Sequence, residues 1–330
     1  MNYYKKQTIK TPILLIGFNR PEVIQESFSF IRLAKPSKLF VSADAARPDK
    51  AGESQQVDAV KRIVQQVDWE CEVFYKFNDI NQGAEVTVSS AISWVLEKEE
   101  TVIVLEDDII APLAFLEFAQ LMLEKYKNDE NVFMISGNQF TEFNLNNDYC
   151  FGMHGHTWGW ATWRRAWNHF DLNVAVSDKF IEILDHPDSN YSFDERIYFK
   201  RRFEKMKNNG PGNNTWDLCW NYIRLLKGGL SIIPSKNLTS NIGVFGLHNH
   251  GFKNVHFLGM DINFKCTKHP EKIVRNVAYD THHYTAYLAP QKSLLIRIMA
   301  RLEKTLRIDQ LKYALRKRDF AQKKKILFQR

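Results

Sequence analysis

Three consecutive carboxylates, Glu106, Asp107 and Asp108, follow the apolar run TVIVL. Buried charge is costly unless a partner compensates it. One explanation is structural: an acid here would cap a helix that begins near Pro112. The other is chemical, because Mg²⁺ and Mn²⁺ prefer oxygen ligands and are often held by one or two carboxylates plus a substrate's phosphates. Such a cation would neutralise a diphosphate leaving group. A helix cap does not explain why Glu106 directly abuts the strand, which favours the cation site.

Asp217 is a second candidate, since it lies between Trp216 and Trp220 at the start of a predicted helix. A carboxylate that takes the proton of an attacking hydroxyl must lie within hydrogen-bonding reach of it. Alternatively, Asp217 simply occupies the first turn of the helix and the tryptophans belong to the core. The residues alone favour neither interpretation.

Three tryptophans lie in the segment WGWATW. Tryptophans at this spacing are more often part of a core, but aromatic faces also stack on the apolar faces of sugars. We expect one of them, Trp160, to face the substrate.

Two His-x-His pairs, His154/His156 and His248/His250, raise the question of zinc. No third ligand at a recognised spacing accompanies either pair, so the sequence does not favour zinc. We expect His250 instead to contribute to diphosphate or metal binding.

The first 140 residues alternate between apolar runs and amphipathic segments. This pattern predicts an α/β fold, with a parallel sheet covered by helices on both faces. Ligands bind such sheets outside the carboxyl ends of the strands. Those ends carry Arg20, Asp44 and the acidic triplet. The composition of the second half of the chain predicts substrate-facing loops between short helices. The predicted strands span 12–18, 38–44, 71–77, 101–106 and 132–137, and the helices lie between them.

Several functional classes lose support. No GxGxxG follows the first strand and no GxxxxGK[ST] occurs, which argues against dinucleotide-binding and P-loop proteins. The net charge is +7, but residues 292–330 carry 13 Lys/Arg and 3 Asp/Glu, which is a net charge of +10. Residues 1–291 therefore carry a net charge of −3, so no nucleic-acid partner is expected. Four scattered cysteines without a CxxC pair, and no apolar run long enough to span a membrane, predict a cytoplasmic protein.

The stretch VIVLEDDIIAPLAFLEFAQ resembles the EDD variant of the DxD motif in GT-A fold glycosyltransferases. The resemblance is closest to glycosyltransferase family 13, the inverting N-acetylglucosaminyltransferases that start N-glycan branching, and their bacterial relatives. It extends over roughly residues 11 to 255. The matching pieces, in the same order, are LIGFNRPEVIQESF, FVSADAARPD, FMISGNQF, WGWATW, TWDLCWNYI and PSKNLTSNIG…HNHG.

The resemblance implies a GT-A fold, that is, a Rossmann-like nucleotide-diphospho-sugar transferase fold with a mostly parallel sheet flanked by helices. It implies that Arg20 and Asp44 contact the nucleotide, with Asp44 accepting from uracil. It further implies that Glu106 and Asp107 contact ribose and sugar, and that Asp108 binds Mn²⁺ or Mg²⁺.

By the same resemblance, Asp217 is the general base of an inverting transfer. The donor is a UDP-sugar such as UDP-GlcNAc, and the acceptor is a glycan or a lipid-linked saccharide, in bacterial surface polysaccharide synthesis. One departure concerns the third predicted helix, where the family has a basic or His residue and this chain has Glu85. Two alternatives stay open: a catalytically silent sugar- or nucleotide-binding relative, and a sugar nucleotidyltransferase.

We expect a catalytic domain over 8–285, with a nucleotide-binding half (8–140) and an acceptor half (141–285). A basic amphipathic helical tail follows over 286–330. Its apolar residues recur at helical spacing, which fits either a helix packed on the body or a surface helix on anionic lipid. We favour the lipid interpretation, and thus peripheral attachment to the inner face of the cell membrane.

Overall fold

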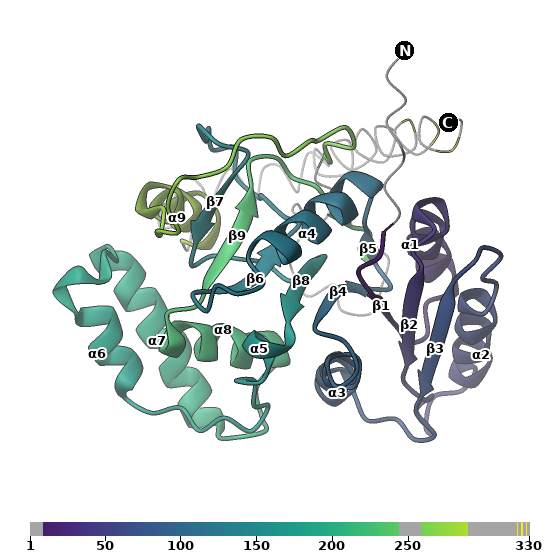
Figure 1. Ribbon diagram of the computed structural model, residues 1–330. Coiled ribbons are helices and arrows are strands. Elements are labelled where there is room, and N and C mark those ends of the chain that lie inside the picture. The colour runs from purple at the N-terminus through teal and green to yellow at the C-terminus, as the bar shows by residue number, and fades with distance from the viewer. Residues whose placement is uncertain (1–8, 244–258, 290–321, 323–324, 326–327, 329–330) are drawn as a thin grey trace, which may run out of the picture.

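The computed structural model describes residues 9–243, 259–289, 322, 325 and 328. His248, His250 and nearly all of the predicted basic tail lie outside these residues. The described chain forms a mixed α/β structure around one large sheet (Figure 1).

The sheet has eight strands in the order β3-β2-β1-β4-β8-β6-β9-β7. β8 is antiparallel to its neighbours β4 and β6, and β7 is antiparallel to β9. The other six run in one direction, so the mostly parallel sheet is confirmed. The strands are β1 (Ile13–Gly17), β2 (Lys38–Ala43), β3 (Glu72–Phe77), β4 (Thr101–Glu106), β6 (Val132–Ser136), β7 (Tyr149–Gly152), β8 (Trp160–Trp163) and β9 (Leu230–Pro234).

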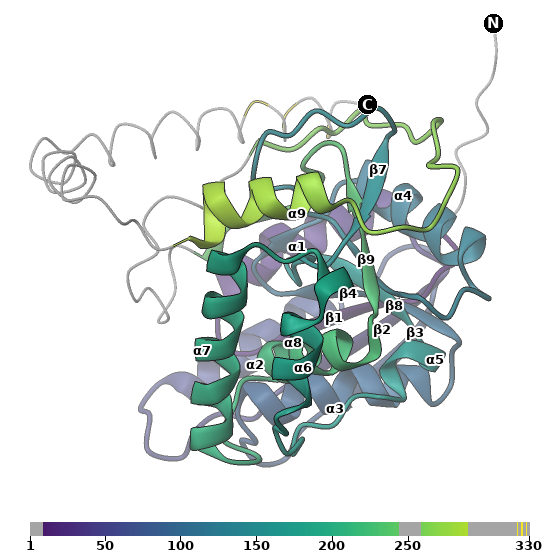
Figure 2. The same ribbon diagram turned by 90° about the vertical axis from the view of Figure 1, so that its left-hand side faces the viewer.

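Helices cover both faces, as the continuous apolar strands predict. In β1, Ile13 and Leu15 pack with α1 and α4, whereas Leu14 and Ile16 pack with α3 and α8. The helices α6, α7 and α8 lie together in the second half of the chain (Figure 2). The helices are α1 (Pro21–Ala34), α2 (Glu53–Val64), α3 (Ala84–Leu96), α4 (Leu113–Lys125), α5 (Arg164–Trp167), α6 (Lys179–Asp185), α7 (Phe193–Asn209), α8 (Trp216–Lys227) and α9 (Val277–His283).

The first four predicted strands and the helices between them appear where the sequence places them. The fifth predicted strand, β6, does not pair with β4, because β8 lies between the two. β8 is the segment WATW, which we had expected to be a substrate-facing loop. Its four residues are all buried, because the strand lies inside the sheet.

The prediction that Trp160 faces the substrate is therefore wrong. Its side chain is fully buried and packs against the rings of Trp167, Trp216 and Trp220. Trp160 lies in this cluster because its large apolar indole is more favourably placed in the core than exposed to water.

Among the described helices, none is both long enough and apolar enough to cross a bilayer. All four cysteines are free thiols.

Candidate active site

The acidic triplet lies at the carboxyl end of β4, next to the end of β1. Arg20, the residue before α1, reaches across to it. Its Nε donates to Asp107 Oδ2 at 3.1 Å, and its Nη2 donates to Asp107 Oδ1 and, at 3.1 Å, to Asp108 Oδ2. One guanidinium thus pairs two of the three carboxylates. Burial alone would lower the pKa of Arg20, but Asp107 and Asp108 outweigh that effect and raise it.

The single positive charge of Arg20 does not balance three carboxylates. Burial raises the pKa of Glu106 to about 8, and the negative charges of Asp108 and Asp107 add to the shift, while Arg20 opposes it. Burial also raises the pKa of Asp107 to about 6, against the opposing effect of Arg20. Three acids and one arginine leave an excess of negative charge that favours a bound cation.

Asp108 faces a second, two-stranded sheet formed by β5 (Ile109–Ile110) and β10 (Ser240–Asn241). A β-carbon on Gly243 would collide with Asp108 Oδ2, so the glycine permits a close approach. α4 begins at Leu113 with Pro112 as its N-cap residue and no side-chain cap, so Asp108 does not cap that helix. The structural explanation for the triplet is wrong.

The donor set around Asp108 fits a magnesium or manganese ion. Among the residues described, Asp108 Oδ1 accepts no hydrogen bond and remains available as a ligand. Within the same residues, no group of three or more His, Cys, Asp or Glu side chains is arranged to hold a metal ion. Asp108 would therefore supply one protein ligand, with water and phosphate oxygens completing the shell, as is common for Mg²⁺.

Asp44, at the end of β2, is buried and its carboxylate is already engaged. Oδ1 accepts from Ala45 N, Asn78 Nδ2 and Gln82 N at 2.9–3.0 Å. Oδ2 accepts from Gln82 N at 3.1 Å and from Gly83 N at 2.9 Å. Asp44 thus anchors the loop between β3 and α3. A uracil base could hydrogen-bond to this carboxylate only by replacing one of these bonds.

A second buried acid beside this edge escaped the sequence analysis. Glu53, the first residue of α2, accepts from Asn19 Nδ2 at 2.8 Å and from Arg47 N at 2.7 Å. Hydrogen bonding to Arg47 lowers the pKa of Glu53 to about 2. Glu53 therefore ties the loop after β1 to the loop after β2, and this shapes the edge on which Arg20 lies.

Asp217 comes to the same region from the second half of the chain. It is half-buried in the first turn of α8. Its negative charge is one cause of the raised pKa values of Glu106 and Glu85, although burial is the largest cause for both. The fold thus brings Asp217 within electrostatic range of the triplet.

Glu85 joins α3 to α8. Its Oε2 accepts a hydrogen bond from the backbone N–H of Trp216, the first residue of α8, at 2.6 Å. The residue that departs from the family pattern therefore has a contact that sequence spacing did not suggest.

Trp158, another tryptophan of the WGWATW segment, is less buried than Trp160. Trp158 is half-buried, and its ring lies 5.1 Å from that of Phe140. The ring of Tyr287 lies 4.8 Å from Phe140 on another side. Trp158 adjoins Gly159, whose added β-carbon would contact Ile109 next to Asp108. Phe140, Trp158 and Tyr287 thus form an aromatic cluster.

The histidines of the first His-x-His pair have different polar neighbours. His156 Nε2 lies 3.0 Å from His283 Nε2, and His154 Nε2 lies 3.5 Å from Glu195 Oε1. The two histidines thus have separate partners. A hydrogen bond between two imidazoles requires that one nitrogen carries a proton and the other does not.

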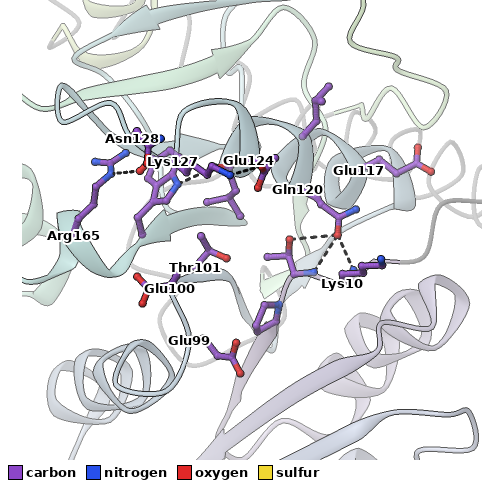
Figure 3. Close-up of a pocket in the computed structure, with 15 residues that line it drawn as sticks. Lys10, Glu99, Glu100, Thr101, Glu117, Gln120, Glu124, Lys127, Asn128 and Arg165 are labelled. Atoms are coloured by element: carbon purple, nitrogen blue, oxygen red, sulfur yellow. Dashed lines mark hydrogen bonds and ion pairs between the residues drawn. The ribbon is translucent and has the colours of Figure 1, made fainter.

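A cavity of about 720 Å³ lies at the amino ends of β1 and β4 (Figure 3). It is lined by Thr11 before β1 and Thr101 at the start of β4, together with Gln120, Glu124 and Arg165. Gln120 Oε1 accepts from Lys10 N and Thr11 N, so this residue fixes the amino end of β1. Because the cavity contains none of the strand-end acids, we do not assign the active site to it.

No protein-family model and no curated protein matches this sequence. Solved structures with some similarity include the mannosyltransferase PcManGT from Pyrobaculum calidifontis in complex with GDP-Man and Mn²⁺, at 13% identity and a TM-score of 0.38, covering 66% of this chain and 69% of that one. Another is mouse xyloside xylosyltransferase 1 in its apo form, at 12% identity and a TM-score of 0.33, covering 65% and 81%. Both similarities are too low to assign a function.

Proposed function

We propose that this protein is a glycosyltransferase of the GT-A type that uses a nucleotide-sugar donor and inverts the anomeric carbon. The proposal is supported by two acidic groups that lie far apart in the sequence and within electrostatic range of each other in the fold. The triplet ends β4, while Asp217 begins α8, and the charge of Asp217 reaches Glu106. The triplet is suited to hold a cation and a diphosphate, and Asp217 is suited to accept a proton.

The reaction needs both groups. An acceptor hydroxyl oxygen forms a bond to the anomeric carbon, while the bond from that carbon to the diphosphate oxygen breaks and the diphosphate leaves with the electron pair. We assign the hydroxyl proton to Asp217, which requires that it lies within hydrogen-bonding reach of the acceptor. Its half-buried position leaves part of the side chain accessible.

The donor would lie along the carboxyl ends of β1, β2 and β4. In this proposal Glu106 and Asp107 contact the ribose and the sugar, and Arg20 holds both aspartates in place. A Mn²⁺ or Mg²⁺ ion on Asp108 would supply positive charge against the departing diphosphate. Asp44 shapes the nucleotide end of the site through the loop that it anchors.

The acceptor would approach from the aromatic cluster. In that cluster Phe140 contacts Trp158, and Tyr287 joins them from beyond α9. Aromatic faces suit the apolar faces of a saccharide. A glycan or lipid-linked saccharide is therefore the proposed acceptor, UDP-GlcNAc the proposed donor, and bacterial surface polysaccharide synthesis the proposed setting.

We take 8–285 as one catalytic domain, with its halves meeting near residue 140, and 286–330 as a basic tail that binds anionic membranes. Deletion of residues 292–330 should abolish flotation with phosphatidylglycerol liposomes at low salt and leave donor binding intact. A full-length protein that does not float would exclude membrane attachment.

A catalytically silent sugar- or nucleotide-binding protein is the second candidate, because Arg20 already pairs with two of the three carboxylates without a cation. A nucleotidyltransferase has less support, since no glycine-rich phosphate loop follows the first strand. A panel of UDP-, GDP- and dTDP-sugars distinguishes these candidates. Thermal stabilisation with Mn²⁺-dependent release of the nucleoside diphosphate supports a transferase, and stabilisation without release supports a silent binder. The absence of both effects across the panel would refute the proposal.

A further inference from the structure

The N-terminus of α8 is capped by a side chain from another helix. The first four amides of a helix have no partner inside it. The N-cap residue of α8, Thr215, makes no side-chain hydrogen bond to them. Glu85 accepts from the first of these amides, Trp216 N, at 2.6 Å. An acid is well placed here, because a helix N-terminus carries partial positive charge.

Glu85 is in turn held on the first half of the chain. It lies in the first turn of α3, whose N-cap Gly83 has a positive φ of 78°. The amides of Gln82 and Gly83 donate to Asp44. Two hydrogen-bonded contacts, close together along the chain, therefore link the end of β2 to the start of α3 and the start of α3 to the start of α8.

Glu85 occupies this position at a cost. Burial raises its pKa, and the like charge of Asp217 adds to the shift, although the Trp216 N–H opposes it. A half-buried acid beside a second acid is unfavourable for stability. The hydrogen bond from Trp216 N–H at the start of α8 offsets part of this cost.

We infer that Glu85 is a positioning residue for Asp217. Its hydrogen bond fixes the start of α8 against α3, and so sets the place of the Asp217 carboxylate relative to the triplet. Asp217 directly follows the bonded Trp216 in the chain. This inference rests on the proposed function for its catalytic consequence, but the anchoring of α8 can be measured without any turnover.

Three full-length variants test the inference. Glu85→Ala removes the acceptor, whereas Glu85→Gln retains a carbonyl oxygen that can accept from Trp216 N and removes the charge. Glu97→Ala is the matched control, since Glu97 is an exposed acid at the other end of the same helix. Circular dichroism is used to check that each variant is folded.

The first measurement is amide hydrogen exchange of a peptide that spans the start of α8. We expect Glu85→Ala to speed exchange there by roughly 10-fold or more, since a charge-assisted hydrogen bond is lost. Glu85→Gln and Glu97→Ala should exchange like the parent protein. Unchanged exchange in Glu85→Ala would overturn the inference, whether or not the protein is an enzyme.

The second measurement separates positioning from binding. With a nucleotide-sugar that the parent protein turns over, Glu85→Ala should lower kcat by about 10- to 100-fold, because a displacement of about 1 Å can cost this much. Donor affinity should not change, and Glu85→Gln should retain kcat within roughly 3-fold. Equal loss in both variants would show that the charge, not the hydrogen bond, is required. If no donor is turned over, the proposed function fails, while the exchange result still decides the anchoring of α8.

Discussion

Arg20 and Asp107 form a two-pronged ion pair, in which Nε and Nη2 donate to opposite oxygens of one carboxylate. Only 6% of the Asp107 side chain and 23% of the Arg20 side chain are exposed. The pair joins the loop after β1 to the end of β4. An acid can therefore follow a core strand directly, because a guanidinium on the neighbouring strand end compensates it.

We expect Arg20→Ala to lower the free energy of unfolding by about 3 kcal/mol, since it leaves buried carboxylates without their partner. Arg20→Lys should restore only part of this loss, because an ammonium cannot donate in the same forked geometry. Urea denaturation at pH 7 measures both. Arg32→Ala is the control: its ion pair with Asp68 is exposed, and its loss should cost less than about 1 kcal/mol. Equal effects of the two alanine variants would contradict a structural role for Arg20.

Glu106 should make stability decrease as the pH rises. Its pKa is raised from 4.5 to about 8 in the folded protein, mainly by burial and then by Asp108. Between these pH values the folded state holds a proton that the unfolded chain has released, so folding is disfavoured as pH increases through 8. Glu106→Gln should match the parent protein at pH 5 and exceed its stability by about 1–2 kcal/mol at pH 9. Thermal melts in EDTA provide the comparison, and equal stability at pH 9 would disprove the expectation.

His156 and His283 should make stability decrease as the pH falls. Burial, reinforced by the positive charges of His154, Arg224 and Arg202, lowers the pKa of His156 to about 3. Burial and the neighbouring histidines also hold the pKa of His283 well below 6.5. The unfolded chain binds these protons below pH 6.5 and the folded state does not, so stability is lost as pH falls.

His156 should contribute up to about 1.4 kcal/mol of destabilisation per pH unit below 6.5, and His283 should act in the same direction. His156→Gln should therefore reduce the pH dependence of the unfolding free energy between pH 6.5 and 5. His186→Gln, at an exposed histidine, should leave that dependence unchanged. Parallel curves for His156→Gln and the parent protein would show that the pair does not remain neutral.

The first half of the fold was predictable because its strands are buried on both faces. β1 and β4 are continuous apolar runs of the length of a strand, and the helix between β1 and β2 begins with Pro21 and Glu22, which suit a first turn. β8 was missed because its four residues are too few to show a period. Its place between β4 and β6 depends on pairing across more than fifty residues.

The part of the candidate site that lies at the carboxyl ends of the strands was predictable from the sequence. Arg20, Asp44 and the triplet do meet at one edge, as the rule for parallel sheets predicts. The engagement of Asp44 by four of the protein's own groups depends on loop geometry that no sequence pattern shows. Glu85 was missed for a similar reason, since its partner lies 131 residues away in the chain.

Asp108→Ala should abolish the effect of Mn²⁺ on donor binding, because it removes the proposed protein ligand. Isothermal titration with UDP, with and without Mn²⁺, gives the result directly. Asp129→Ala, in an exposed turn after α4, serves as the control and should bind like the parent protein. Unchanged Mn²⁺-dependent affinity in Asp108→Ala would exclude this site for the cation.

The most direct test of the account is the turnover of Asp217→Asn with whichever nucleotide-sugar the parent protein consumes in Mn²⁺. Asparagine has nearly the same shape but cannot take the proton of the acceptor. We expect the release of nucleoside diphosphate to fall by about 10² to 10⁴, the range for loss of a general base, while the dissociation constant of the donor stays the same. Near-normal turnover in Asp217→Asn would contradict the assignment of Asp217 as the base of a glycosyl transfer at this site.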